Sequence, residues 1–123
     1  MEFPHPVVYA VDLEHCDTLS TVGSDEIAET FRAALCRAGA TIVGDALHQF
    51  SGGGLTCVFI LSESHAALHT WPETGTVNID IFSCSPRLGS LAVIEELRRS
   101  FGARRVTIQE IPRADGRHPR PRG

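Results

Sequence analysis

Two amphipathic helix patterns, set among short apolar runs, constrain the fold of this chain more than any other feature. Residues 25–38 repeat apolar side chains on one helical face after an acidic first turn, and the pattern stops before Gly39. A second pattern of the same kind covers residues 88–101 and stops before Gly102. Each helix must bury its apolar face against another layer, so we expect both to cover a sheet.

Five apolar or alternating runs are typical of strands around these helices. They cover residues 7–13, 40–50, 55–61, 76–84 and 104–111. A glycine-rich turn joins the second and third runs into a hairpin. The predicted order is β-α-β-β-β-α-β, which favours an α+β fold: a two-layer sandwich of an antiparallel sheet with both helices on one face.

The length of 123 residues allows one domain with a core of its own. We expect residues 1–112 to form this domain and residues 113–123, rich in arginine and proline, to be a disordered tail. The net charge is −4 although the tail is basic, and an acidic body argues against a nucleic-acid partner. No apolar run is long enough to span a membrane and no signal-peptide pattern is visible, so we expect a cytoplasmic protein without a membrane partner.

The eleven residues counted as lysine or arginine are all arginine. A chain without lysine cannot hold pyridoxal phosphate (PLP) through a lysine, use a lysine nucleophile or complete a Walker A loop. The four cysteines are scattered without close pairs, so we expect neither a disulfide framework nor a zinc knuckle.

Residues 62–75 connect two predicted strands, and we expect such a connector to lack distinctive side chains. This one instead contains polar, aromatic and histidine residues. These residues could form one more strand, with His65 and His69 as polar edge groups. In a helix the same histidines could share a metal, but the internal glutamate of the zinc peptidase motif is missing, and we predict no metal site. Ser64 and His69 could also serve a hydrolase, but no G-x-S-x-G elbow surrounds the serine.

This segment resembles the prokaryotic S-adenosylmethionine decarboxylase proenzyme family, the small pyruvoyl-dependent class. The matching residues are S-E-S-H-x-x-x-H-T-W-P-E at residues 62–73, followed by I-D-I-F-S-C at residues 79–84. G-A-T-I-V at residues 39–43 and H-x-F at residues 48–50 agree as well. The resemblance covers residues 7–111, and motifs of this length are highly specific.

The resemblance implies that the chain cleaves itself between Glu63 and Ser64. Ser64 Oγ would attack the carbonyl of Glu63, an ester would replace the peptide bond, and β-elimination would convert Ser64 into a pyruvoyl group. This group, a pyruvate derivative, would be the cofactor, with neither metal nor PLP. Decarboxylation of an α-amino acid needs an electron sink conjugated to the amine, and the pyruvoyl carbonyl would provide it in a chain without lysine.

The resemblance also assigns roles to other residues. His69 would move protons during self-processing, and Thr56 stands in place of the family's processing serine. Cys84 would return a proton to the α-carbon after carbon dioxide leaves. Phe50 would stack on the adenine, and Glu73 would hold the ribose hydroxyls.

The function implied is S-adenosylmethionine decarboxylase, which supplies the aminopropyl donor for spermidine biosynthesis, in a homodimer whose active sites use both subunits. One alternative is a diverged pyruvoyl-dependent ornithine or arginine decarboxylase, which would not need the nucleoside contacts of Phe50 and Glu73. Another is an unprocessed, non-catalytic binding module, an alternative motivated by Thr56. Thr74 and Thr76 replace aromatic residues common in the family and reshape the pocket wall.

Overall fold

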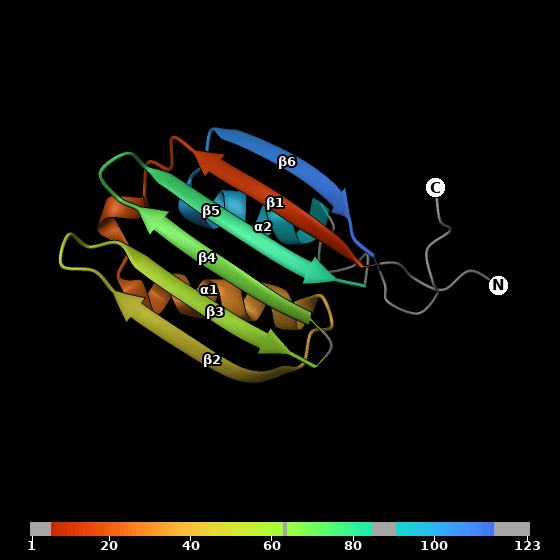
Figure 1. Ribbon diagram of the computed structural model, residues 1–123. Coiled ribbons are helices and arrows are strands. Elements are labelled where there is room, and N and C mark those ends of the chain that lie inside the picture. Colours follow the sequence, from red (N-terminus) through yellow and green to blue (C-terminus); the bar gives the residue numbers. More distant parts are fainter. Residues whose placement is uncertain (1–5, 63, 85–90, 115–123) are drawn as a thin grey trace.

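The computed structural model describes residues 6–62, 64–84 and 91–114 of the chain. Within these residues the chain forms six strands, two α-helices and one short 3-10 helix (Figure 1). In chain order they are β1 Val7–Glu14, η1 Leu19–Thr21, α1 Ser24–Arg37, β2 Ile42–Gln49, β3 Leu55–Leu61, β4 Ser64–Trp71, β5 Thr76–Ser83, α2 Leu91–Phe101 and β6 Arg105–Pro112.

All six strands belong to one antiparallel sheet in the order β2-β3-β4-β5-β1-β6. The first strand of the chain, β1, therefore lies between two later strands. Figure 1 shows α1 and α2 side by side on one face of the sheet. The predicted α+β class, with an antiparallel sheet and both helices on one face, is confirmed.

The sheet has one strand more than the predicted order. The five predicted strands are present, each within two residues at both ends, and β4 occupies the segment that the order left as a connector. Ala66 and Leu68 of β4 are buried, whereas His65 and His69 lie on its other side. The strand interpretation of this segment is thus correct, and the helix that a histidine metal pair would need is not formed.

Helix α1 begins at Ser24, one residue earlier than predicted, and Gly23 takes its cap position. The helix ends at Arg37, and Gly39 follows with a φ of 97°, a left-handed conformation that favours glycine. Helix α2 is described from Leu91, so the predicted start at residue 88 lies outside the described residues. No helix of the described chain is long and apolar enough to cross a membrane.

The hydrophobic core lies between the sheet and the two helices. Phe31 of α1 and Phe101 of α2 are almost completely buried there. The Phe31 ring packs on Phe59 of β3 with 5.6 Å between the ring centroids. Burying one such side chain stabilises the fold by roughly 1.5–3 kcal/mol, so this face holds the two layers together.

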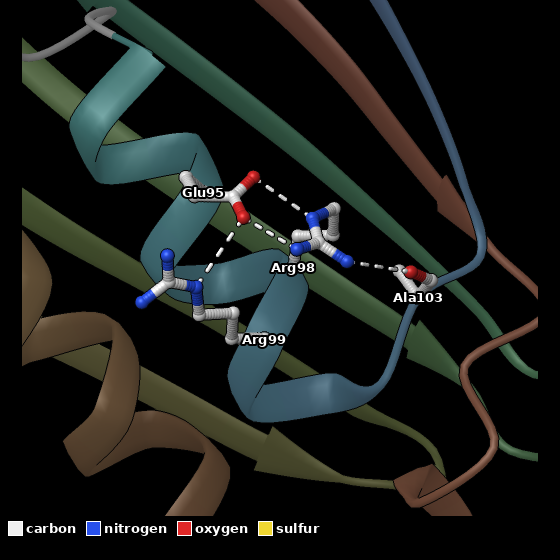
Figure 2. Close-up of polar contacts among 4 residues, drawn as sticks. All are labelled: Glu95, Arg98, Arg99 and Ala103. Carbon is white, nitrogen blue, oxygen red and sulfur yellow. Dashed lines mark hydrogen bonds and ion pairs between the residues drawn. The ribbon is translucent and has the colours of Figure 1, made fainter.

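Polar contacts tie the end of α2 to the chain that follows it (Figure 2). Glu95 accepts hydrogen bonds from Arg98 and Arg99, and Arg98 also donates to the carbonyl oxygen of Ala103 at 3.5 Å. The hydrogen bonds and charges of the two arginines lower the pKa of Glu95 to about 2. Beyond β6, the Arg113 N–H still donates to a backbone carbonyl, while residues 115–123 of the predicted tail lie outside the described residues.

The face of the sheet opposite the helices, here called the open face, is covered by no element of the described residues. Strand register arranges its side chains in rows, one of which crosses five strands. This row consists of Ile60, His65, Phe82, Val8 and Ile111. Ile60 is 54% and Ile111 is 45% exposed, so apolar surface faces outward at both ends of the row.

Candidate active site

A cavity of about 440 Å³, here called the pocket, opens at one end of the open face. It lies where the glycine-rich turn after β2 meets the end of β4 and the turn between β4 and β5. Four residues with predicted roles line it: Phe50, Thr56, His69 and Glu73. The fold therefore gathers residues that are far apart in the sequence into one concave site.

Thr56 and His69 form the polar centre of the pocket. They are register partners on β3 and β4, and Thr56 Oγ1 lies 2.9 Å from His69 Nδ1. Both side chains are half-buried. An imidazole can take up and release a proton, and a hydroxyl in hydrogen-bond contact with it orients the ring. The pair is therefore suited to proton transfer.

Close backbone contacts set the shape of the pocket around Phe50. The buried Thr70 hydroxyl accepts a hydrogen bond from the Leu55 N–H at 2.9 Å. A Cβ at Gly54 would lie 3.0 Å from the carbonyl oxygen of Thr70, so a larger residue would require the Thr70 backbone to shift. The Phe50 N–H donates to the carbonyl oxygen of Gly54 at 2.8 Å, and the ring, which His48 contacts, stays 53% exposed.

Glu73 lies in the turn that joins β4 to β5. The Thr74 N–H donates to the carbonyl oxygen of Trp71 at 3.1 Å, and Gly75 completes the turn with a φ of 66°. The Glu73 side chain is exposed at the rim of the pocket. A carboxylate in this position can accept hydrogen bonds from ligand hydroxyls.

Ser64 and Cys84 both lie at the opposite end of the sheet, here called the Ser64 edge. Ser64 is the first residue of β4, and Cys84 directly follows β5. Because His65 pairs with Phe82, the antiparallel register brings Ser64 and Cys84 to the same edge. Both side chains are half-buried. Glu63, the other predicted residue of the cleavage site, lies outside the described residues.

The structure does not bring Ser64 and His69 together within one chain. They are five positions apart on an extended strand, which separates their Cα atoms by roughly 16 Å. His65, the imidazole next to Ser64 in sequence, lies on the open face and stacks on Phe82 with 5.5 Å between ring centroids. The serine–histidine pair considered for a hydrolase is therefore not formed in one chain.

The four cysteines, all within the described residues, are free. Burial raises the pKa of the Cys16 and Cys57 thiols to about 11, so both remain protonated at neutral pH. Cys36 is exposed on α1. Among the four, Cys84 alone lies at the Ser64 edge.

Within residues 6–62, 64–84 and 91–114, no three His, Cys, Asp or Glu side chains gather in a way that could hold a metal ion. His65 and His69 share the open face, but they are four positions apart on an extended strand, which separates their Cα atoms by roughly 13 Å. The two histidines of the motif therefore cannot ligate one ion together.

One group of polar residues beside the pocket is absent from the predicted site. Trp71 Nε1–H donates to Asn78 Oδ1 at 2.6 Å, and Asn78 Nδ2–H donates to Asp12 Oδ1 at 2.8 Å. Strand alternation alone could have placed each side chain on one face. Only the register among β4, β5 and β1 shows that the three meet.

Comparison with known proteins gives the site its context. The family model described as S-adenosylmethionine decarboxylase matches residues 8–114. The S-adenosylmethionine decarboxylase proenzyme of Acidithiobacillus ferrooxidans is 35% identical over 109 residues, which cover 89% of this chain and 80% of that protein. The chain belongs to the S-adenosylmethionine decarboxylase family.

Other members of the S-adenosylmethionine decarboxylase family are similar to it. The proenzyme of Shouchella clausii is 34% identical over 105 residues, covering 85% of this chain and 81% of its own length. The proenzyme of Pseudomonas aeruginosa is 38% identical over 92 residues, which cover 75% of this chain and 58% of that protein. A crystal structure of the adenosylmethionine decarboxylase from Aquifex aeolicus has the same fold, with a TM-score of 0.79, 22% identity, and coverage of 98% of this chain and 100% of that one.

Proposed function

We propose that this chain is a self-processing S-adenosylmethionine decarboxylase whose pyruvoyl group derives from Ser64. Its product would be the aminopropyl donor for spermidine synthesis. Within a member of this family, the observation that carries the proposal is the grouping of the site residues: Phe50, Thr56, His69 and Glu73 at the pocket, and Ser64 with Cys84 at the opposite edge. The four free thiols suit a reduced, cytoplasmic setting.

Self-processing would begin when Ser64 Oγ attacks the carbonyl carbon of Glu63, which turns the peptide bond into an ester and frees the amine of residue 64. β-Elimination then breaks the ester C–O bond, leaving a carboxylate on Glu63 and a carbon–carbon double bond in residue 64. Tautomerisation and hydrolysis by one water release ammonia and leave the ketone. Both the acyl shift and the elimination need a base, for which we propose His69, oriented by Thr56.

We further propose that this base comes from a second copy of the chain. Within one copy, His69 lies roughly 16 Å along β4 from Ser64, so it cannot reach the bond to be cut. If two open faces pack around a two-fold axis that runs perpendicular to β4, the ends of the two β4 strands are exchanged, and the pocket of one copy would meet the Ser64 edge of its partner. The outward apolar side chains of Ile60 and Ile111 support burial of this face.

In this arrangement the pocket would receive the nucleoside part of S-adenosylmethionine. The exposed ring of Phe50 suits stacking on adenine, and its face also suits a sulfonium cation. The carboxylate of Glu73 suits the ribose hydroxyls. The pyruvoyl group would supply the electron sink for the loss of carbon dioxide. Cys84, beside it, would return a proton to the α-carbon.

Intact mass and carbon dioxide release test the proposal together. We expect the purified protein to contain two fragments divided between Glu63 and Ser64, the second blocked to Edman chemistry. It should release carbon dioxide from S-adenosylmethionine and not from ornithine or arginine. A chain that stays uncut for days contradicts self-processing and favours a binding module. Turnover of a basic amino acid alone contradicts the assigned substrate.

A further inference from the structure

The pocket has one aromatic wall to which the proposed function gives no role. Trp71, the last residue of β4, lines the pocket and is 50% exposed. It is also the single tryptophan of the chain. A half-exposed side chain can move among rotamers unless a partner holds it, so the contacts of the indole decide the shape of this wall.

A hydrogen-bond chain across three strands holds the indole. It runs from Trp71 Nε1–H to Asn78 Oδ1 at 2.6 Å and from Asn78 Nδ2–H to Asp12 Oδ1 at 2.8 Å. Asn78 and Asp12 are direct register partners on β5 and β1. Trp71 pairs with Thr76, which makes Asn78 its diagonal neighbour on the same face.

The chemistry of the three groups fixes the direction of this chain. An indole N–H can only donate, and an ionised carboxylate can only accept. Asp12 therefore takes a donor from the amide of Asn78, which turns the amide oxygen toward Trp71. One amide orientation satisfies all three groups, and the negative charge on Asp12 strengthens the hydrogen bond that it accepts from Asn78.

We infer that Asn78 is a positioning residue for substrate binding, which acts by holding the Trp71 indole as a wall of the pocket. The inference rests on the proposed function, because it takes the pocket as the place where the nucleoside of S-adenosylmethionine binds. Trp71 would contact that nucleoside through its aromatic face. Asn78 and Asp12 act through Trp71 and do not touch the reacting atoms.

Binding can be followed by the fluorescence of Trp71 in a Ser64→Ala background, which removes both cleavage and turnover. The probe is 5′-deoxy-5′-methylthioadenosine, a nucleoside thioether without an amino-acid group. We expect a saturable change in indole emission. Asn78→Leu keeps the side-chain size without polar atoms, so it should weaken binding about fivefold and lower the indole anisotropy. Gln109 carries an exposed amide on the same face of β6, so Gln109→Leu is the matched control. It should leave both the binding affinity and the indole anisotropy unchanged.

The processed enzyme provides a second readout. Asn78→Leu should raise KM for S-adenosylmethionine about fivefold with kcat changed less than about twofold, because the lost contact shapes binding and not the reacting groups. Asp12→Asn retains an acceptor for Asn78 and should stay close to the parent. Asp12→Leu removes it and should resemble Asn78→Leu.

Each contrary outcome is informative. Unchanged affinity and anisotropy in a folded Asn78→Leu protein would overturn the inference; Asn78→Ser replaces this variant if it fails to fold. No response to methylthioadenosine by a protein that, with Ser64 intact, decarboxylates S-adenosylmethionine would overturn the inference and leave the proposed function standing. A parent chain that neither cleaves nor releases carbon dioxide would overturn both.

Discussion

The pocket and the Ser64 edge lie at the two ends of one strand, and they differ in what a single chain supplies. At the pocket, Thr56 and His69 are already in contact at 2.9 Å. At the Ser64 edge, Cys84 lies at the same end of the sheet as the serine, while the neighbouring His65 lies on the open face. Under the proposed function, one end of β4 would bind substrate and transfer protons, and the other would be cut. One copy of the fold would then separate these tasks by the length of a strand.

Removing the Ser64 hydroxyl should have the largest effect, which is on self-cleavage at the Ser64 edge. We expect Ser64→Ala to abolish self-cleavage, because no other atom of residue 64 can attack the preceding carbonyl. Mass spectrometry should then find one uncut chain of 13.3 kDa. Ser62→Ala, a serine two positions earlier in the exposed turn, is the matched control and should still cut. Cleavage of Ser64→Ala at this bond would contradict the assignment.

Mixing two inactive variants tests whether the two ends meet between copies. Ser64→Ala keeps His69, and a tagged His69→Ala keeps Ser64, so neither should cut alone. Coexpression should restore cleavage of the His69→Ala chain in mixed dimers, up to about half of those chains if copies pair at random. The cut fraction is read from the mass of the tagged fragment. Continued absence of cleavage in verified mixed dimers would mean that the base does not act across the interface.

Replacing Cys84 should affect turnover and leave self-cleavage intact. Cys84→Ala should still cleave, because Ser64 and His69 remain, but its kcat should fall about 100-fold or more when the proton donor is lost. Cys36→Ala, an exposed thiol on α1, is the control and should match the parent in both measurements. An uncut Cys84→Ala protein would place the thiol in processing instead.

The Thr56 hydroxyl should have an intermediate effect. Thr56→Val keeps the shape and removes the hydrogen bond to His69, so we expect self-cleavage to slow about tenfold. Thr56→Ser restores the hydroxyl and should cleave at least as fast as the parent. The fraction cut over time, measured by gel or mass, distinguishes them. Equal rates for all three would show that the hydroxyl does not assist His69.

The smallest effect should come from a surface far from both ends of β4. Hydrogen bonds from Arg98 and the nearby charges lower the pKa of Glu95 to about 2, so its stabilising contribution is fully present above pH 4.5 and is lost as the pH falls toward 2. Glu95→Gln should lower Tm by about 1 °C at pH 7 and match the parent near pH 2. Cleavage and turnover should not change. A Tm difference that persists at pH 2 would indicate lost packing in place of lost charge.

Much of the fold could be predicted from periodicity alone. The helices and five of the strands follow from apolar residues at helical or alternating spacing, and glycine marks where both helices stop. Strand β4 was harder to predict, because its polar positions carry the motif. These positions partly hide the alternation of Ala66 and Leu68 with the histidines. Its sequence serves two purposes at once, and the strand period is the weaker signal.

The candidate site was predictable in its residues and not in its geometry. The motif between residues 62 and 73 names Ser64, His69 and Glu73 in one run of sequence. An extended backbone then places Ser64 at the opposite end of the strand from the other two. The Trp71–Asn78–Asp12 chain could not be predicted, because it depends on cross-strand register, which the sequence of a single strand does not contain.

The strand order of the sheet has a consequence for how the protein would keep its shape after a cut between residues 63 and 64. The first fragment would contain β1, β2 and β3, and the second would contain β4, β5 and β6. In the sheet, however, β1 lies between β5 and β6. Three of the five pairings, β3 with β4, β5 with β1 and β1 with β6, would therefore join the fragments. The intact chain folds in a unimolecular reaction, whereas the mature protein, once unfolded, would have to refold in a concentration-dependent encounter of two pieces. Maturation would thus make the order of events irreversible, because the chain must fold before it is cut.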